Sequence, residues 1–377
     1  MGARRSGLAN RGAGTGGDVL YRRALNRATL HRQLLLHRAT LDVVEAVHRV
    51  GGLNAQHPND PYLALHSRLA GFTLADLTTA IARRRLVRST MMRATQHLVT
   101  PADFRSLRPV LAPLLTRVQR NTFGRRTAGV DLGQVVAEAR GLLADGVLTR
   151  PELGRRLAAS RPGADGMALA WSVQYLLPVL HPAPSGTWDT LTTTPFALAD
   201  TWLGPMYPPD PRQLVRRYLS AFGPAAAADM RAWSGVSGLR EVVEDMRGEL
   251  RTFRDEAGRD LYDLPEAPRP DPDTPAPARL LAGYDNLLLA YADRTRVMTD
   301  ETRRRVCVGD LVDHTILIDG VVSGTWQLDR DAAKVTVRPF TRLAPANVEA
   351  LVTQAHRVLD LTVPDAAAPD VQILPLS

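Results

Sequence analysis

Apolar residues recur at helical spacing through the first third of the chain. Within Leu41–Val50 they stand at positions 41, 43, 44, 47 and 50, which lie on one face of a helix. Gly51-Gly52 then ends that helix. Similar patterns predict a helix over Tyr62–Ala70 and another over Leu74–Ala82, the latter with Thr73 as its N-cap.

A strand pattern follows these helices. Leu86–Val99 alternates apolar and polar residues, which predicts two short strands around Met92-Arg93-Ala94. Three helices and a hairpin, in this order, are typical of a winged helix-turn-helix module. The order recurs twice at intervals of roughly 75 residues, which indicates a tandem array. The later copies comprise predicted helices over Val135–Leu143, Thr149–Ala158, Leu169–Leu180, Leu214–Ala221, Ala225–Trp233 and Gly238–Leu250, a turn-rich wing over His181–Trp188 and a hairpin over Leu250–Leu264.

The pattern changes after the proline- and acid-rich segment Pro265–Pro277. Three β-rich runs follow, and Asp319-Gly320 between two of them is the strongest hairpin signal in the chain. The runs are His314–Ile318, Val321–Gln327 and Lys334–Phe340, before a final helix over Ala346–Asp360. The sequence therefore predicts an α+β fold, mainly α, with tandem winged helix-turn-helix modules and a β-rich C-terminal unit. The predicted boundaries are 1–17 for a basic tail, 18–128, 129–210 and 211–264 for three modules, 265–278 for a linker and 279–377 for the C-terminal unit.

Composition fits a globular protein. A hydrophobic content of 45% and a mean hydropathy of −0.14 exclude wholesale disorder. No run of 18 uncharged apolar residues occurs, so we expect no membrane span. Cys307 is the only cysteine, which excludes an intramolecular disulfide and a cysteine-cluster metal site. Residues 1–17 are rich in glycine and arginine and lack the apolar core of a signal peptide, so we expect a disordered tail.

The positive charge is concentrated at one end. The chain has a formal charge of +8, but residues 1–126 alone hold 21 Arg against 6 Asp and Glu. Such a field suits a polyphosphate partner. The alternative is that arginines are scattered over the surface of a protein from a GC-rich genome. Lys334 is the single lysine, so a mechanism that needs a side-chain amine has one candidate.

Most enzyme signatures are absent from the sequence. There is no phosphate-binding loop, His-Glu-x-x-His, Gly-x-Ser-x-Gly or dinucleotide fingerprint, and the nine histidines have no convincing metal-ligand spacing. The segment Gly51–Pro61 remains, inside the most basic module. Asn54 and Gln56 lie two residues apart, so in extended backbone their amides share a face. The alternative is that these residue types only satisfy the backbone of a turn.

Four blocks of sequence resemble a known family. They are Gly51–Gln56 with Tyr62–Arg68; Leu86–Val99 with Asp103; Tyr284–Leu289 with Asp293-Arg294; and Asp319-Gly320 through Trp326. In this order they resemble the AlkZ/YcaQ-like winged-helix DNA glycosylases, and the match spans most of residues 19–377. The resemblance implies a C-shaped protein of tandem winged helices whose concave, basic face holds duplex DNA. It also implies hydrolysis of the N-glycosidic bond of purines alkylated at N7, in self-resistance to DNA-alkylating natural products or in unhooking of interstrand crosslinks.

The resemblance assigns the catalytic residues to Asn54 and Gln56. The family signature is Gln-x-Gln, or Gln-x-Asp in the YcaQ-like branch, whereas this chain has Asn54-Ala55-Gln56. The second glutamine matches, and Asn54 is shorter than the usual first glutamine by one methylene. Ala94 likewise stands where glycine is usual.

Amide catalysis is chemically reasonable for such a substrate. Alkylation at N7 makes the purine cationic, so it leaves without protonation, and the enzyme has to hold a water against C1′. An amide orients water as donor and acceptor together. A lyase-type glycosylase would instead need an amine nucleophile. Lys334 lies far along the chain in a β-rich segment, so we expect a monofunctional hydrolase.

Further residues are candidates for DNA contact. Thr95 and His97 either contact DNA or pack the first hairpin. The Asp319-Gly320 hairpin resembles the element that relatives insert toward the minor groove, with Val321 and Val322 as a possible apolar wedge, or is simply a hairpin. Asp285, with Asp293-Arg294, is expected to form a structural ion pair. Five arginines are candidates for phosphate contacts: Arg83, Arg84, Arg85, Arg88 and Arg93. For Arg83, Arg84 and Arg85 the alternative is that they are surface arginines without a partner.

The sequence thus predicts a monomeric DNA glycosylase for bulky N7-alkylated purines in double-stranded DNA. We expect no cofactor, no metal and no membrane association, and a cytoplasmic, nucleoid-associated location. Two rivals remain. A non-enzymatic winged-helix regulator would normally dimerise on a palindrome, and no coiled-coil heptads are present. A drug-sequestering resistance protein would not need the positive field of residues 1–126.

Overall fold

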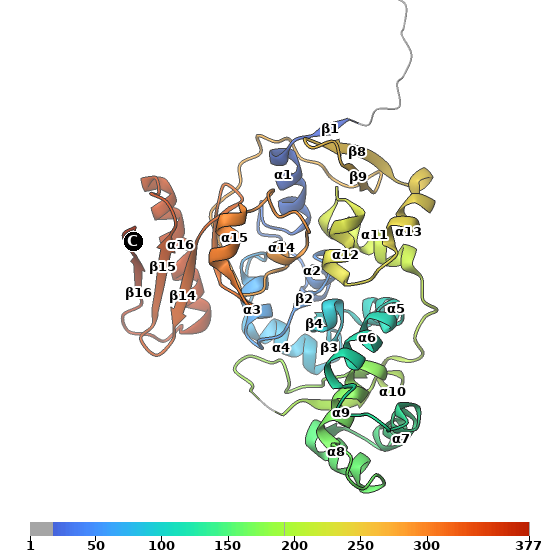
Figure 1. Cartoon of the computed structure of the whole chain (residues 1–377). Helices are drawn as coiled ribbons and strands as arrows, with labels where there is room; N and C mark the ends of the chain where they lie inside the picture. Colours follow the sequence, from blue (N-terminus) through green and yellow to red (C-terminus); the bar gives the residue numbers. More distant parts are fainter. Residues whose placement is uncertain (1–17, 192, 377) are drawn as a thin grey trace, which may run out of the picture.

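The computed structural model describes residues 18–191 and 193–376. The tail predicted for residues 1–17 lies outside the described residues. Figure 1 shows several helical units and a separate C-terminal sheet, with the segment that follows α2 near the middle of the molecule. This mixture of helices and small sheets agrees with the predicted α+β class. Among the described helices, none combines the length and the apolar character needed to cross a bilayer.

The first unit begins after α1 (Arg22–Arg32) and contains the predicted hairpin. The helix α4 has the predicted bounds, and Thr73 and Asp76 form a capping box at its start. The three strands form a sheet in the order β2-β4-β3. The elements of the first unit are α2 (Val43–Arg49), β2 (Leu53–Asn54), α3 (Asp60–His66), α4 (Leu74–Ala82), β3 (Val87–Thr90), a 3₁₀ turn η1 (Met92–Ala94) and β4 (Gln96–Val99). Helices α5 (Pro101–Val110) and α6 (Ala112–Phe123) follow.

The second unit repeats the order helix, strand, helix, helix, strand, strand. Its sheet has the order β5-β7-β6, so the last strand is again central. The predicted end of the helix over Leu169–Leu180 is wrong. The helix ends at Leu176, because Pro178 cannot donate a helical hydrogen bond, and residues 179–180 form a strand instead. The elements are α7 (Leu132–Ala144), β5 (Leu148–Thr149), α8 (Arg150–Ala159), α9 (Gly166–Leu176), β6 (Val179–Leu180) and β7 (Pro195–Leu198), followed by α10 (Ala199–Leu203).

The third unit has the same connectivity. Ala225 bridges Tyr262, so β9 lies between this bridge and β8. The predicted hairpin turns at residues 256–259, as expected. The elements are α11 (Pro211–Phe222), α12 (Ala227–Ser234), α13 (Leu239–Asp245), a 3₁₀ turn η2 (Arg247–Glu249), β8 (Arg251–Asp255) and β9 (Asp260–Asp263), with β1 (Val19–Leu20) parallel to β8. Three units therefore share one topology.

The C-terminal unit is built on a five-stranded sheet of order β10-β13-β14-β15-β16. Figure 1 shows α16 beside this sheet, at the edge of the molecule away from the helical units. The sequence missed β10, β16 and the small β11–β12 hairpin. The elements are β10 (Arg279–Leu281), α14 (Asn286–Leu289), α15 (Asp300–Val306), β11 (Cys307–Val308), β12 (Leu311–Val312), β13 (Thr315–Ile318), β14 (Val321–Asp329), β15 (Lys334–Pro339), α16 (Pro345–Thr362) and β16 (Asp370–Ile373).

The helix α1 is polar in composition but packs between the third and C-terminal units. Arg32 makes a two-pronged ion pair with Asp263 of β9, at 2.7 and 2.8 Å. Asn26 donates to the backbone carbonyls of Arg296 and Gly320, both at 2.8 Å. Carbonyls of the proline-rich segment, including that of Pro268, accept hydrogen bonds from arginines of α1. The segment predicted as a linker thus lies along α1.

A second buried ion pair joins the first unit to the C-terminal unit. Arg68, just after α3, donates to both carboxylate oxygens of Asp285 at 2.7 and 2.8 Å, and both side chains are 0% exposed. The partner of Asp285 is therefore Arg68, not the neighbouring Asp293-Arg294 that the sequence suggested; Asp293 pairs with Arg259. The expected structural role of Asp285 holds with a different partner.

Removing one member of this pair leaves the other charge buried without compensation. We expect Asp285→Asn to lower the free energy of unfolding by about 3–5 kcal/mol, measured by urea denaturation. The exposed pair Arg140–Asp200 provides the control, and Arg140→Gln should cost under about 1 kcal/mol. Equal losses in the two variants would contradict the role given to Asp285.

Candidate active site

The loop that carries Asn54 and Gln56 begins at two glycines with positive φ. Gly51 has φ 88° and Gly52 has φ 84°, a conformation that other residues rarely adopt. A Cβ on Gly52 would lie 2.8 Å from Val99 Cγ1 and 3.2 Å from the carbonyl oxygen of Leu98. The chain therefore turns directly from α2 into β2 against β4, and this turn sets the start of the loop.

The carbonyls of this turn are held by buried amides from outside the unit. Asn286, which follows Asp285, donates to the carbonyl of Gly52 and, at 3.3 Å, to that of Val50. Gln33 also donates to the Val50 carbonyl, at 3.1 Å. Asn286, which belongs to a block of sequence that resembles the family, thus fixes the start of the loop through hydrogen bonds to its backbone.

The amide of Asn54 orders the loop. Asn54 is on β2, 6% exposed, and its Oδ1 accepts the backbone N–H of Gln56 at 3.0 Å. The side chain of Gln56 is exposed, and its Oε1 accepts the backbone N–H of Gln96 at 3.1 Å. Among the described residues, neither Asn54 Nδ2 nor Gln56 Nε2 has a hydrogen-bond partner. Each amide is held through its oxygen and keeps its NH₂ group available.

Arg88 holds the next residue of the loop. Its Nε donates to the carbonyl of Ala55 at 3.0 Å, and its Nη1 donates to Ser185 Oγ at 2.9 Å. A Cβ on Gly186 would lie 2.6 Å from Arg88 Cδ, so the second unit closes over this side chain. Burial lowers the pKa of Arg88 to about 10. Arg88 therefore links the loop to the second unit through its hydrogen bonds.

The β6–β7 connection of the second unit lies across the start of α3. Asn59 Nδ2 donates to the carboxylate of Asp189, whose backbone N–H donates back to Asn59 Oδ1, both at 2.8 Å. The Trp188 backbone N–H donates to the Tyr62 hydroxyl, and the two rings meet edge to face. One flank of the loop is thereby covered by the second unit.

The position of His97 decides between its two alternatives. It is 1% exposed, lies on β4 opposite Asn54 and Ser89, and its Nδ1 is 3.0 Å from the Thr95 carbonyl. Burial, with a contribution from nearby Arg93, lowers the pKa of His97 to about 3. Because the side chain is buried, His97 packs the hairpin and presents no surface to a ligand.

Arg93 and Thr95 are also engaged within the protein. Arg93 has φ 52° and donates through Nη1 to the carbonyl of Trp233 in the third unit. Burial lowers its pKa to about 10. Thr95 Oγ1 donates to the carbonyl of Met92 at 3.1 Å. Arg93 thus joins the wing of the first unit to the third unit.

The three arginines after α4 are exposed, and two of them have partners. Arg84 lies over the Trp202 ring, 3.6 Å from its centroid, and Arg85 pairs with Asp42. Arg83 has no ion-pair or hydrogen-bond partner through its side chain among the described residues. Of the five arginines singled out from the sequence, Arg83 is the one left free.

The hairpin at Asp319-Gly320 packs against α1, which corrects the expectation of a DNA-facing turn. The Asp319 carboxylate accepts hydrogen bonds from Arg23 and Arg27. A Cβ on Gly320 would lie 2.5 Å from Leu30 Cδ1 and 2.6 Å from Asn26 Oδ1. Gly320 therefore has to be glycine because the turn is pressed onto the helix.

Of the two valines that the sequence suggested as an apolar wedge, only Val321 is exposed. Val322 is 4% exposed and belongs to the core beneath α15, whereas Val321 is 42% exposed. The sequence missed a second hairpin, β11–β12, whose Val308 and Leu311 are 62% and 64% exposed on either side of Gly309-Asp310. The flanking valine and leucine around a Gly-Asp turn were the signal that would have revealed it.

This exposed hairpin lies close to the start of α3. The Tyr284 hydroxyl donates to the carbonyl of Asp310, and a Cβ on neighbouring Gly283 would lie within 3.5 Å of both Asp60 and the Val312 carbonyl. Asp60 in turn lies 3.4 Å from His314 Nε2. The hairpin is thus positioned near the end of the loop that carries Gln56.

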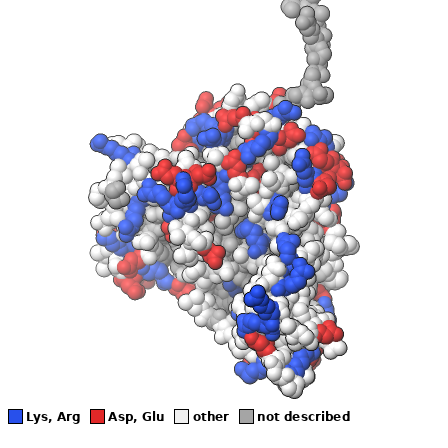
Figure 2. Space-filling view, viewed as in Figure 1, with Lys and Arg blue, Asp and Glu red and all other residues white. Residues whose placement is uncertain are grey.

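Charge on the surface is unevenly distributed. Figure 2 shows acidic side chains gathered mostly over the upper part of the molecule, while basic side chains dominate around the central hollow and below it. Within residues 18–191 and 193–376, no group of three or more His, Cys, Asp or Glu side chains could hold a metal ion. The site offers amides and arginines rather than metal ligands.

Comparisons with known proteins identify the family and the fold of the chain. The model of the DNA glycosylase AlkZ-like family matches residues 47–361. Among solved structures, the fold is similar to Streptomyces sahachiroi DNA glycosylase AlkZ, with a TM-score of 0.78 and 23% sequence identity over 94% of this chain and 100% of that one. A search of curated proteins gave no match.

The buried His97 makes the stability depend on pH. Its folded pKa, about 3, is below the ordinary value of 6.5, so between these values the unfolded chain binds a proton that the folded protein does not. The free energy of unfolding should therefore fall as pH decreases through this window, by about 1.4 kcal/mol per pH unit from this group. Urea titrations from pH 7 to pH 5 should show a shallower slope for His97→Gln. The exposed His356→Gln should keep the wild-type slope, and equal slopes for both variants would contradict the assignment.

Proposed function

The chain belongs to the AlkZ-like DNA glycosylase family, and from this premise we propose that it is a monofunctional glycosylase for bulky N7-alkylated purines in duplex DNA. The observation that carries the proposal is the loop Asn54-Ala55-Gln56, in which one hydrogen bond fixes each amide oxygen and leaves a second lone pair on Gln56 Oε1 to accept from a water. Its role is repair, or self-resistance to a genotoxic antibiotic, with interstrand crosslinks among the candidate lesions.

The repeated topology supports a DNA-binding scaffold. The first two units each have a helix, a strand, two helices and two strands, with the last strand central in the sheet; in the third unit the bridge at Ala225 takes the place of the first strand, and β9 lies between it and β8. We interpret these units as winged helices, in the tandem order expected from the sequence. In the first unit, α3 and α4 then form the helix-turn-helix and the β3–β4 connection is the wing.

The proposed chemistry needs a positioned water and little proton transfer. An N7-alkylated purine is already cationic, so bond cleavage at C1′ leaves the base as a neutral molecule and places positive charge on the sugar. Gln56 reaches the solvent side and holds the water; Asn54, 6% exposed, fixes the backbone beneath it. The spare lone pair of Gln56 Oε1 accepts a hydrogen bond from the water, whose oxygen attacks C1′ as the neutral base leaves, and the proton that the water loses passes to solvent.

A lyase mechanism through Lys334 has no structural support. Lys334 lies on β15 of the C-terminal sheet, and its Nζ is 3.0 Å from Asp370 on the neighbouring strand β16. A Schiff base requires a free amine at the sugar. The hydrolytic reaction therefore remains the one that these residues favour.

Two surface features are proposed for DNA binding. Arg83 is exposed and free to contact a phosphate, while the apolar tip of β11–β12, with Val308 and Leu311, suits insertion between base steps from the minor groove. We propose that this hairpin takes the role that the sequence suggested for Asp319-Gly320. A monomer suffices, because the three units and the hairpin belong to one chain.

Base release tests the catalytic loop. With an oligonucleotide carrying one N7-alkylguanine adduct, wild type should give an abasic site that breaks only after alkali. Gln56→Ala should lower the single-turnover rate by about 10²–10³-fold, as for loss of one positioned hydrogen-bonding group. Asn54→Ala should also lose activity, because the backbone of Gln56 loses its acceptor.

Gln134→Ala, an exposed glutamine of α7, serves as the control and should keep the wild-type rate. No release by the wild type from small or bulky adducts, with duplex binding intact, would contradict the proposed substrate class. Full activity in Gln56→Ala would contradict the role of the loop.

Arg88 and Arg83 should separate loop positioning from phosphate binding. Arg88→Gln removes the donor to the Ala55 carbonyl, so we expect about tenfold slower base release with unchanged salt dependence of duplex binding. Arg83→Gln should do the reverse and reduce the slope of log K against log salt by about one. A reduced salt slope in Arg88→Gln would show that Arg88 contacts phosphate after all.

A further inference from the structure

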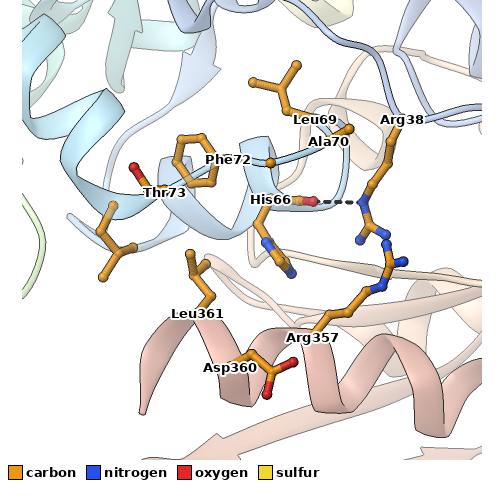
Figure 3. A pocket seen from close by; sticks show the side chains of 11 residues that line it. Arg38, His66, Leu69, Ala70, Phe72, Thr73, Arg357, Asp360 and Leu361 are labelled. Atoms are coloured by element: carbon orange, nitrogen blue, oxygen red, sulfur yellow. Dashed lines mark hydrogen bonds between the residues drawn. The ribbon is translucent and has the colours of Figure 1, made fainter. Parts of the chain in front are cut away.

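A cavity of about 640 Å³ lies between the end of α3 and the helix α16, at residues that the glycosylase proposal does not use. Its walls come from three places: Arg38 before α2, His66 at the end of α3 with residues 69–74 up to the start of α4, and Arg357, Asp360 and Leu361 on α16. Figure 3 shows the guanidinium groups of Arg38 and Arg357 facing each other, with the His66 ring beside them.

The cationic groups here lack carboxylate partners. Arg38 donates to the His66 carbonyl at 3.0 Å and to Gln354 Oε1 at 2.9 Å, both neutral acceptors. Arg357 makes no ion pair among the described residues. Like charges packed without an opposite charge cost free energy, and an anion between the two guanidinium groups would remove this cost.

A third arginine increases the positive potential, and a neutral histidine adds a hydrogen-bonding group. Arg279 is 5% exposed and its Nε has no hydrogen-bond partner among the described residues; burial, with a contribution from nearby Arg357, lowers its pKa to about 10. His66 Nε2 is likewise buried without a partner. Burial, together with Arg38 and Arg357, lowers the pKa of His66 to about 4, so the ring is neutral near pH 7 and can donate or accept one hydrogen bond.

The rest of the wall is apolar. Leu69 and Phe72 are 3% and 8% exposed, and Leu74 and Leu361 lie beside them. A recess with two arginines on one side and aliphatic and aromatic groups on the other suits a small molecule with an anionic end and an apolar body. A phosphate of duplex DNA offers no apolar part for these groups.

We propose that this cavity binds a small organic oxyanion, a phosphate ester or carboxylate with an apolar group, between Arg38 and Arg357. Asp360 at the rim opposes the anion and limits the affinity. Bound there, the ligand joins α16 to the α3–α4 connection and so stabilises the contact between the first and C-terminal units. This site is separate from the proposed glycosylase chemistry, since none of its residues belongs to the catalytic loop.

Isothermal titration of the full-length protein with phenyl phosphate tests the proposal. We expect saturable one-to-one binding, at least tenfold weaker binding of inorganic phosphate and no binding of neutral benzyl alcohol. Arg357→Gln should weaken phenyl phosphate binding at least tenfold, and Asp360→Asn should strengthen it at least twofold. The control Arg342→Gln makes the same charge change at an exposed position of the C-terminal unit that does not line the cavity, and should stay within twofold of wild type.

Competition with an undamaged duplex distinguishes a free ligand from the DNA backbone. We expect saturating duplex to leave phenyl phosphate binding unchanged. Displacement by the duplex, combined with weaker duplex binding in Arg357→Gln, would assign the arginines to DNA phosphate and overturn the proposal. Absence of saturable binding, or equal affinity in Arg357→Gln and Arg342→Gln, would overturn it as well.

Discussion

The ion pair between Arg68 and Asp285 is the constraint from which the geometry of the site follows. Both side chains are fully buried, so separating the two segments would leave each charge without its partner in the protein interior. This loss of compensation costs several kcal/mol, roughly 3–5, which holds the two segments together. Arg68 also donates to the carbonyls of Gln33 and Ala64, which adds the segment after α1 and the helix α3 to the same junction. A residue more than 200 positions away along the chain is thereby fixed beside the first unit.

The neighbouring Asn286 transmits this constraint to the candidate active site. It binds the carbonyls of the turn after α2, while Arg88 holds the other side of the loop at Ala55. In the proposed reaction, Asn54 and Gln56 need no strong acid or base beside them, because the surrounding hydrogen bonds fix the loop that carries their amides.

Several arginines hold segments of the fold together rather than face solvent. Arg27, Arg32 and Arg68 are buried, and Arg88 and Arg93 donate to carbonyls of other segments. The net positive charge of residues 1–126 therefore overstates the number of groups free to meet a phosphate. Five donors in a planar fork make arginine suited to such bridges between units, a task that a single lysine amine could not perform as well.

The sequence by itself determined the local elements and the identity of the loop. Periodicity placed α4 within its observed bounds, and the wing and the β8–β9 hairpin followed from alternation and turn residues, because these depend on neighbours along the chain. Tertiary structure alone decided the partners. His97 is buried, Asp319-Gly320 packs on α1, Asp285 pairs with Arg68, and the exposed hairpin is β11–β12, because burial and ion pairing depend on segments distant in sequence that one-dimensional spacing does not record.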